Sequence, residues 1–379
     1  MFSFLKNLFF WPKKTYNQDL EGGEWKKTMS TRKRKHGKEE KSKAVSEKKK
    51  EKTEDAGKCP KTRRLLADPK RSVRDVILEQ NRADKDLLHK LVAGEITRKQ
   101  FKAQTSERLV GQWQWGFCSH NIRDSKYLCK HGCKYCYIGP MFARFGRNCI
   151  QTAMEDLMPV DKSKVSNVSP YGRLVAMPSD RKMVFFPSSS DIFQENAEDY
   201  VAACKKMIDA GHEIMYVTKT PKGAPEAVVA AFEKLEESEK YKRAMTIYIT
   251  ITSDDPAILD KFEPNAPKIE ARLAALHYFA LHGFHVNIMM EPYLSDPIPL
   301  LPKLLAELPP DGIITVGKMN YTPQITFSED HKQNAELLAY LDALYSRENT
   351  MRMYEMVHDN PRLFLKKDSV MAVVKFAGK

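Results

Sequence analysis

The sequence predicts an α/β fold built on a parallel sheet, and two observations lead to this prediction. The first is that apolar strands alternate with helical segments from Trp113 to about Tyr345, at a spacing typical of βαβ units. The second is the number of units. Six units favour a barrel or a partial barrel over a doubly wound sheet, although periodicity alone leaves both open. In either arrangement, reactive groups are expected at the carboxyl ends of the strands.

Two segments precede the alternating region. The first is predicted to be a basic, disordered tail, because residues 26–64 are dominated by Lys, Glu, Ser and Thr and offer little to bury. The second is a helical lead-in, for which Ser72 is a candidate N-cap and Gly94 a candidate stop. The predicted organisation is a tail (1–64), a helical lead-in (65–111), a barrel (112–346) and a C-terminal helix and strand extension (347–379).

Each predicted strand of the alternating region is a short apolar or β-branched run, and a helix-like pattern follows most of them. The predicted strands are GFCSHNI (116–122), KMVFFP (182–187), EIMYVTK (213–219), MTIYITIT (245–252), FHVNIMME (284–291) and GIITVG (312–317). The predicted helices span residues 196–210, 225–239, 268–282, 300–308 and 328–346. Glycine is predicted to end two of these helices, at Gly211 and Gly283.

The net charge is concentrated in the tail. The whole chain carries 62 basic and 49 acidic residues, a formal charge of +13. Residues 1–64 hold 20 basic and 9 acidic residues, a net of +11, which leaves a net of +2 for the remaining 315 residues. Basic segments attract polyanions. A charge-driven contact with nucleic acid is therefore expected from the tail and hardly at all from the body.

Composition also bears on location. No stretch reaches the roughly 18 uninterrupted apolar residues of a membrane-spanning helix. Seven unevenly spaced cysteines argue against a secreted disulfide scaffold and indicate an intracellular, reducing compartment. The cytoplasm is the simplest location, and the run Arg32–Lys35 is either a nuclear-import signal, a polyanion contact or part of a solubilising tail. The apolar segment Met1–Trp11 is interpreted as a loose or locally docked terminus rather than a surface anchor.

The most informative segment is a loop predicted after the first strand, with three cysteines in eight residues. Cys129, Cys133 and Cys136 are separated by three and two residues, so a single turn can aim their sulfurs at one point. Thiolates are soft ligands for zinc and for iron–sulfur clusters. A structural zinc ion needs a fourth ligand, for which Cys118 is the candidate, because His131 is too close to its neighbours to join easily. A [4Fe–4S] cluster on three cysteines instead leaves one iron open.

Cys-x3-Cys-x2-Cys with an aromatic residue before the last cysteine is the signature of the radical S-adenosylmethionine (SAM) superfamily, and this sequence resembles it. The resemblance implies a partial (β/α)6 barrel of the TIM type, a [4Fe–4S] cluster on the three cysteines, and SAM bound at the open iron. It further implies reductive cleavage of SAM to a 5′-deoxyadenosyl radical that abstracts hydrogen, and an electron donor such as flavodoxin or ferredoxin. The cofactor supplies this chemistry, and the protein positions it.

Residues 250–296 narrow the resemblance to the spore photoproduct lyase and DNA repair photolyase-like branch. The matching features are Thr252-Ser253, Glu263-Pro264-Asn265-Ala266-Pro267, Arg272-Leu273 and Gly283, together with Cys133–Tyr137 and the strand ends Ser188–Asp191 and Thr218–Pro221. A phage-associated radical-SAM-like family is a second resemblance. The match covers about Trp115–Val316, so it excludes the tail, the lead-in and the last 60 or so residues. Within it, Glu263 and Arg272 either form a buried structural pair, which is the favoured interpretation, or contact SAM.

Five residues of the matched region are candidate SAM contacts, and four of them have a structural alternative. Ser190 and Asp191 are expected to accept hydrogen bonds from the SAM ammonium, with helix capping as the alternative. Lys219 is expected to meet the SAM carboxylate as a point charge, with a solvated loop lysine as the alternative. Ser253 is a candidate contact for the ribose or carboxylate. Tyr135 is a candidate for packing against adenine or the radical site, and plain packing explains it nearly as well.

One departure from the branch bears on the reaction. Spore photoproduct lyase uses a cysteine near the second strand end as hydrogen-atom donor, and Ser188 stands at the best-aligned position here. A serine O–H bond is too strong to donate a hydrogen atom to a carbon radical, so that thymine-dimer lyase mechanism is not expected. Cys149, which follows an arginine-containing loop, is the better candidate donor, whereas Cys204 is interpreted as core. Tyr137, beside the last cysteine of the motif, is the second candidate catalytic residue.

Three functions remain open from the sequence. The first is a radical SAM enzyme that acts on nucleic acid, by lesion repair or base modification, with the basic tail holding the polyanion. The second is a radical SAM enzyme for a peptide or a small molecule, with the tail serving localisation only. The third is a zinc-stabilised nucleic-acid-binding module that uses four thiolates, Cys118, Cys129, Cys133 and Cys136. The sequence determines neither the substrate nor the oligomeric state.

Overall fold

The computed structural model of the chain describes residues 71–106, 118, 120–121, 129–136, 138, 181–320 and 330–377. These residues belong to one compact unit, which spans Lys58–Lys379. The predicted tail of residues 1–64 and the candidate catalytic residues Tyr137 and Cys149 lie outside the described residues. Within the described ranges, no helix has the length and apolar character needed to cross a membrane.

Seven parallel strands form one sheet in the described residues, and their order in space is their order in the sequence. They are β1 (His120–Asn121), β2 (Met183–Phe185), β3 (Glu213–Thr218), β4 (Met245–Thr250), β5 (His285–Met290), β6 (Ile314–Val316) and β7 (Leu363–Leu365). Sequential parallel strands with helical crossovers make a partial (β/α) barrel, which confirms the predicted fold class. Strand β7 comes from the predicted C-terminal extension and adds a seventh strand to the six expected ones. The predicted division of the chain into segments stays a prediction.

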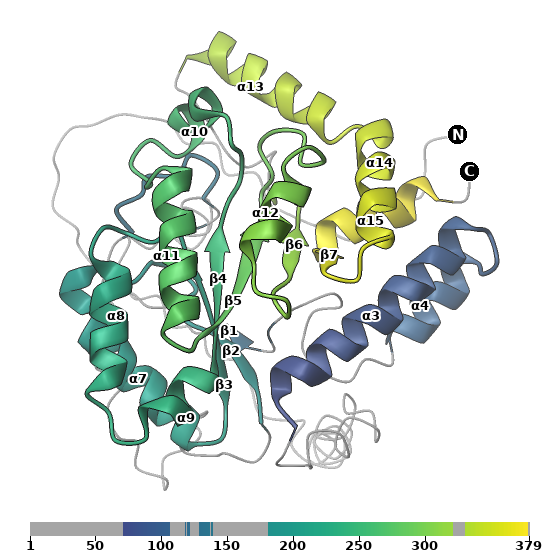
Figure 1. The fold of residues 1–379 in the computed structure, drawn as a ribbon. Helices are drawn as coiled ribbons and strands as arrows, with labels where there is room; N and C mark the ends of the chain where they lie inside the picture. Colours follow the sequence, from purple (N-terminus) through teal and green to yellow (C-terminus); the bar gives the residue numbers. More distant parts are fainter. Residues whose placement is uncertain are drawn as a thin grey trace, which may run out of the picture. The chain divides into compact units, whose positions relative to one another are not determined.

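Helices cover the outer side of this sheet. The connections from β2 to β6 hold η3 (Gln194–Asn196), α7 (Ala197–Asp209), α8 (Ala224–Glu233), α9 (Ser238–Arg243), α10 (Pro256–Phe262), α11 (Ile269–Leu281) and α12 (Leu301–Glu307). Helices α13 (His331–Leu344) and α14 (Arg347–His358) precede β7, and α15 (Lys367–Phe376) follows it. Helix α7 packs on β3, α11 packs on β4 and β5, and α14 packs on β7, as Figure 1 shows.

The single helix predicted over residues 225–239 is wrong, because the structure divides it into α8 and α9. The chain turns between them, and Glu237 takes a left-handed conformation with a φ of 57°. Four glutamates crowd residues 233–239, and like charges three or four residues apart destabilise a helix. The turn also allows α9 to bury Tyr241, whose hydroxyl donates a hydrogen bond to Asp209 Oδ1 at 2.9 Å. Charge repulsion and tertiary packing therefore both favour the break.

The two faces of the sheet pack against different partners. Side chains alternate along each strand, so Ile214 and Tyr216 of β3 join the core beneath the outer helices, whereas Met215 between them joins the inner face. The inner-face cluster consists of Met183, Met215, Tyr248, Met289, Ile313 and Phe364 from the sheet and its connections, packed against Val73, Val76, Ile77 and Leu78 of α3 (Val73–Val92). Helix α3 thus closes the concave side of the partial barrel.

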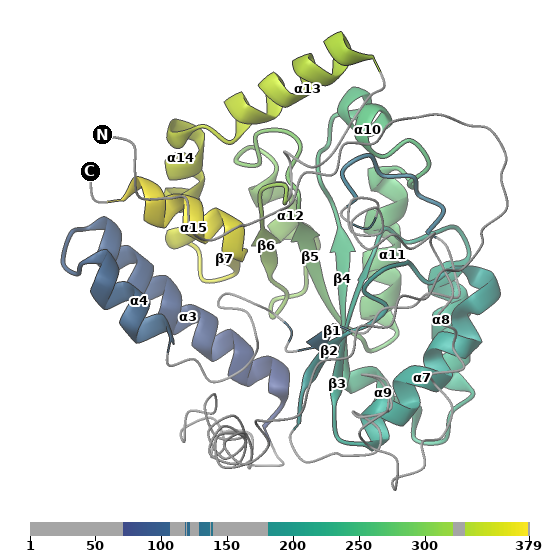
Figure 2. The same cartoon turned by 180° about the vertical axis from the view of Figure 1, so that it is seen from behind.

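Helix α3 is fastened to the amino end of β3. Ser72 caps it as predicted, since the Ser72 hydroxyl accepts a hydrogen bond from the N–H of Asp75 at 3.0 Å. The carboxylate of Glu213, the first residue of β3, accepts from the N–H groups of Val73 at 2.6 Å and Arg74 at 3.0 Å. Helix α4 (Arg98–Ser106) follows, and α3 contacts α15 (Figure 2). The helical lead-in is therefore an integral part of the packed unit.

Candidate functional site

The predicted site residues gather at the carboxyl edge of the sheet. Asp191 follows β2, Lys219 directly follows β3, and Ser253 follows β4. Parallel strands bring such positions to one edge, as expected from the sequence pattern. The segment 129–136, called the cysteine loop below, lies at this edge because its side chains are hydrogen-bonded to two buried carboxylates, those of Asp191 and Glu263.

Asp191 is the first of these carboxylates, and it is almost fully buried at 4% exposure. Its Oδ2 lies 2.8 Å from His131 Nε2 and accepts from the N–H of Lys219 at 2.9 Å. Its Oδ1 accepts from the Tyr216 hydroxyl and from the N–H of Ile192, both at 2.8 Å. Burial alone raises the pKa of Asp191, but the hydrogen bond and charge of His131, with the other donors, hold this pKa below its ordinary value.

Glu263, the C-cap of α10, is the second carboxylate, and its side chain is 0% exposed. It accepts hydrogen bonds from the hydroxyl of Tyr135, from the guanidinium of Arg272 and from Thr252 Oγ1, the last at 2.9 Å. Lys219 Nζ lies 3.9 Å from its Oε1. Burial raises the pKa of Glu263, yet the cations Lys219 and Arg272 and these hydrogen bonds hold it below its ordinary value. The buried structural pair of Glu263 and Arg272, expected from the sequence, is confirmed.

The backbone of the cysteine loop also pairs with the segment that follows α10. The N–H of Lys134 donates to the carbonyl of Phe262 at 2.9 Å, and the N–H of Asn265 donates to the carbonyl of His131 at 3.3 Å. Gly132 has a φ of 62°, and a Cβ atom there would lie 3.0 Å from Asn265 Nδ2. Glycine therefore serves both the left-handed turn and the close approach of the two segments.

The three loop cysteines are free, with Cys129 exposed and Cys133 and Cys136 partly buried. Burial raises the pKa of Cys133, and the nearby ammonium of Lys219 opposes this shift. Among the residues described here, no three His, Cys, Asp or Glu side chains are arranged to hold a metal ion. The donor chemistry still fits a [4Fe–4S] cluster, since three free thiols share one short loop that reaches the surface. Their role as cluster ligands stays a prediction.

Lys219 lies between the two carboxylates. Its N–H binds Asp191, while its ammonium faces Glu263 and lies 5.3 Å from the ring centroid of Tyr135. Burial alone lowers the pKa of Lys219, but the neighbouring Cys133 and Glu263 hold it above its ordinary value. The lysine is therefore a charged, paired group with 14% of its side chain exposed, and not a solvated loop lysine.

Ser190 and Ser253 form local hydrogen bonds at their strand ends. The hydroxyl of Ser190 donates to the backbone carbonyl of Asp191 at 3.2 Å. The hydroxyl of Ser253 lies 2.8 Å from that of Ser295 and accepts from the N–H of Asp255 at 3.0 Å, just before α10. Ser190 therefore does not cap a helix, the alternative given for it, and Ser253 stabilises the turn before α10. A contact with SAM stays a prediction for each.

The remaining described cysteines lie in different surroundings. Cys118 packs with Val217 against the inner-face cluster, and burial raises its pKa to about 11. The charged groups that act on Cys118 are Lys366 and Glu291, which follow β7 and β5. Cys204 is 1% exposed in α7 and belongs to the core, as interpreted from the sequence.

Sequence reasoning missed His131 and Tyr216 as residues of this site. The spacing of the motif marks His131 only as an unfavourable metal ligand, yet in the structure it contacts Asp191. Tyr216 belongs to an apolar strand, and its ring is buried beneath the outer helices. A buried tyrosine hydroxyl usually finds a hydrogen-bond partner, so a tyrosine inside such a strand is a usable signal for a polar group nearby.

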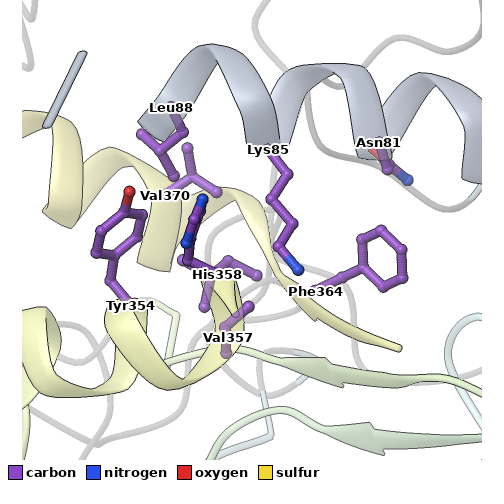
Figure 3. Close-up of a pocket in the computed structure, with 9 residues that line it drawn as sticks. Asn81, Lys85, Leu88, Tyr354, Val357, His358, Phe364 and Val370 are labelled. Atoms are coloured by element: carbon purple, nitrogen blue, oxygen red, sulfur yellow. The ribbon is translucent and has the colours of Figure 1, made fainter. Parts of the chain in front are cut away.

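A separate small cavity lies between α3, α14, β7 and α15 (Figure 3). Its volume is about 10 Å³, which is room for about one water molecule. Lys85 reaches into it and donates hydrogen bonds to the carbonyls of Asn360 at 2.6 Å and Leu363 at 3.2 Å. Burial lowers the pKa of Lys85 to about 8. These bonds tie α3 to the turn before β7, so this cavity is a packing feature and not part of the candidate site.

No family model matches the sequence, and no curated protein matches it. Among solved structures, the chain is similar to a cysteine-to-serine variant of spore photoproduct lyase, with a TM-score of 0.40 and 14% identity over 59% of this chain and 61% of that chain. It is similar to spore photoproduct lyase complexed with dinucleoside spore photoproduct, with a TM-score of 0.39 and 15% identity over 56% and 57% of the two chains. The chain thus resembles spore photoproduct lyase at low identity, over less than two thirds of the length of those structures.

Proposed function

We propose that this chain is a radical SAM enzyme that holds a [4Fe–4S] cluster on Cys129, Cys133 and Cys136. One observation carries the proposal: the Cys-x3-Cys-x2-Cys loop lies at the carboxyl edge of a partial (β/α) barrel, fastened to Asp191 and Glu263. When bound, the cluster supplies the electron for reductive cleavage of SAM. The carboxyl edge is where (β/α) barrels place their reactive groups, which supports this assignment.

In this proposal the chain's own residues have three roles: they bind the cofactors, orient them and exclude water from the site. The ammonium of Lys219 acts on Cys133 and offsets negative charge on the thiolates. Ser190, Ser253 and Tyr135 are the proposed SAM contacts, together with the strand end that carries Asp191. The inner-face cluster is apolar and buried, so the sheet excludes water where this face packs against α3.

We assign the substrate class as nucleic acid, with the enzyme acting as a lyase or a modifying enzyme. Two features support this: the resemblance of residues 250–296 to the DNA repair photolyase-like branch, and the net charge of +11 on residues 1–64. Ser188, which is 5% exposed after β2, stands at the position that aligns best with the donor cysteine of spore photoproduct lyase. The proposal is therefore a lesion repair or base modification that does not use that donor. Cys149 and Tyr137 are the proposed catalytic residues.

Anaerobic reconstitution of the full chain tests the enzyme class. We expect a brown protein with about four irons per chain, and 5′-deoxyadenosine after addition of dithionite and SAM. Cys133→Ala should lose the iron, whereas the matched change Cys204→Ala in the core should retain it. A colourless protein with stoichiometric zinc, or a brown protein that yields no 5′-deoxyadenosine, would contradict the proposal.

Isotope transfer tests the substrate class. Hydrogen from a labelled lesion-containing oligonucleotide should appear in 5′-deoxyadenosine. Removal of residues 1–64 should weaken nucleic-acid binding and flatten its salt dependence. Because the body carries a net charge of only +2, a peptide or small-molecule substrate is the second candidate. Full 5′-deoxyadenosine formation without transfer from any nucleic acid would favour that candidate.

A further inference from the structure

We propose that His131 and Tyr135 are positioning residues, which hold the cysteine loop in shape through Asp191 and Glu263 before any cofactor binds. His131 lies between the first two cysteines of the motif and contacts Asp191, while Tyr135 lies between the last two and donates to Glu263. Each interval of the motif therefore has one side chain that fastens it to a buried carboxylate. The inference rests on the proposed function, because the loop matters only if it holds the cluster. The positioning itself is tested on the iron-free protein.

The Asp191 carboxylate keeps its orientation independently of the loop. It accepts from the hydroxyl of Tyr216 in β3, from the N–H of Ile192 after β2 and from the N–H of Lys219 after β3. Tyr216 and Ile192 are each 1% exposed, so these donors hold the carboxylate from within the packed barrel. His131, itself 4% exposed, is therefore the partner that this acceptor positions.

Arg272 fixes the second carboxylate in a similar way. Its guanidinium pairs with Glu263 and also donates to the carbonyls of Pro267 at 2.7 Å and Thr250 at 2.9 Å. One buried cation thus ties both ends of the segment Glu263–Pro267 to the end of β4. This segment is the same one that pairs with the loop backbone. The Glu-Pro-Asn-Ala-Pro string and the arginine that follows it therefore form a platform beneath the cysteine loop.

Lys219 connects the two anchors. Its N–H donates to Asp191 and its ammonium lies 3.9 Å from Glu263, so the two carboxylates share one cationic partner. Loss of one anchor should therefore loosen its own interval of the loop most and the other interval to a smaller extent. Such coupling is expected when charged groups share one buried network.

The test is the alkylation rate of each cysteine in the full, reduced, iron-free chain, measured by N-ethylmaleimide labelling and peptide mass mapping at constant pH. His131→Phe keeps the ring but removes the polar contact, and Tyr135→Phe removes only the hydroxyl. We expect alkylation about tenfold faster at Cys133 in the first variant and at Cys133 and Cys136 in the second, whereas Cys129 is already exposed and should change less. Buried Cys204 should keep its wild-type rate.

Matched controls separate positioning from general loss of packing. Tyr241→Phe and Tyr354→Phe each remove a tyrosine hydroxyl that binds neither anchoring carboxylate, since Tyr241 donates to Asp209 and the Tyr354 hydroxyl lies 3.2 Å from His89 Nδ1. Their loop cysteines should stay within about twofold of the wild-type rate. His131→Gln retains an N–H donor, so it should recover much of the slow alkylation that His131→Phe loses.

Two results would overturn the inference: loop rates in His131→Phe and Tyr135→Phe that match those of the controls, or an equal acceleration at Cys204, which would indicate global unfolding. The outcome is separate from that of the proposed function. Absence of iron binding and of 5′-deoxyadenosine would reject the enzyme class without changing these rates. Normal iron loading with unaffected alkylation would reject the positioning role alone.

Discussion

Glu213 and Glu263 are both buried carboxylates, and they lie at opposite ends of the parallel strands. Glu213 begins β3 at the amino end, where it accepts from two N–H groups of α3 and from Arg181 at 3.1 Å. Glu263 lies at the carboxyl end, where it accepts from side chains of the loop, of β4's end and of α11. The first carboxylate fastens a helix, and the second fastens the loop that carries the cysteines.

The two carboxylates differ in pKa for a physical reason. Burial raises the pKa of Glu213, and the helix N–H groups and Arg181 do not fully offset this effect. Burial also raises the pKa of Glu263, but Lys219 and Arg272 more than offset it and leave the pKa below its ordinary value. The amino end of the sheet thus holds a carboxylate that burial disfavours in its charged form, while the carboxyl end collects cations that keep its carboxylate ionised. The contrast indicates that charged groups are stabilised around Glu263 at the carboxyl end, whereas Glu213 at the amino end serves mainly packing.

The largest expected effect is that of Glu263→Gln. The substitution leaves the guanidinium of Arg272 buried with a neutral partner, and breaking a buried ion pair typically costs about 3–5 kcal/mol. We expect a loss of that size in the free energy of unfolding from urea denaturation, together with faster alkylation of the loop cysteines. If Glu263→Gln lowered the free energy of unfolding by less than about 1 kcal/mol, the buried charges at the carboxyl end would not differ in importance from those at the amino end.

Glu213→Gln should have a smaller effect on stability and none on the loop. It weakens two helix N–H bonds and the contact with Arg181, whose side chain is 25% exposed, so we expect a loss of about 1–3 kcal/mol. Urea denaturation and cysteine alkylation of the folded chain measure the two effects. Accelerated alkylation of Cys129, Cys133 or Cys136 in this variant would show that the ends are coupled, contrary to the comparison.

Gly132→Ala is expected to cost about 1–2 kcal/mol, because alanine is strained at a φ of 62°. The added Cβ atom would also press on the amide of Asn265. Gly94→Ala is the matched control, since its φ is 78° and a Cβ atom there meets nothing within 4 Å. Both changes should lower stability, but only Gly132→Ala should change the alkylation of the loop cysteines. Equal loop rates in the two variants would argue against close packing of the loop on its platform.

The smallest expected effect is on pH dependence, where the two carboxylates act with opposite sign. The lowered pKa of Glu263 adds stability that is present above its unfolded value of about 4.5 and is lost as the pH falls through the folded value. The raised pKa of Glu213 adds stability that is full below about 4.5 and is lost as the pH rises through the folded value. The free energy of unfolding can be measured by urea denaturation between about pH 3 and pH 7. It should fall less steeply on acidification in Glu263→Gln than in wild type, and it should fall less steeply on raising the pH in Glu213→Gln. Slopes equal to wild type in both variants would contradict these assignments.

Much of the fold follows from local pattern. The strand expected at residues 245–252 is β4 (Met245–Thr250), and the helix expected at residues 268–282 is α11 (Ile269–Leu281), because side-chain periodicity is a local property. The candidate site can be predicted only in part from local pattern. Strand-end positions predicted that Asp191, Lys219 and Ser253 share one edge, but the contacts that each side chain makes depend on what packs above that edge.

The sequence by itself determined the α/β class, the six strands of the barrel region and the cysteine spacing, since each depends on residues close together in the chain. Only the tertiary structure decided that β7 joins the sheet, that α8 and α9 are separate, and that His131 and Tyr135 meet Asp191 and Glu263. Those last partners are 60 and 128 residues apart. Their pairing is enforced by the cost of burying a carboxylate without donors, a constraint that appears only once the chain has folded.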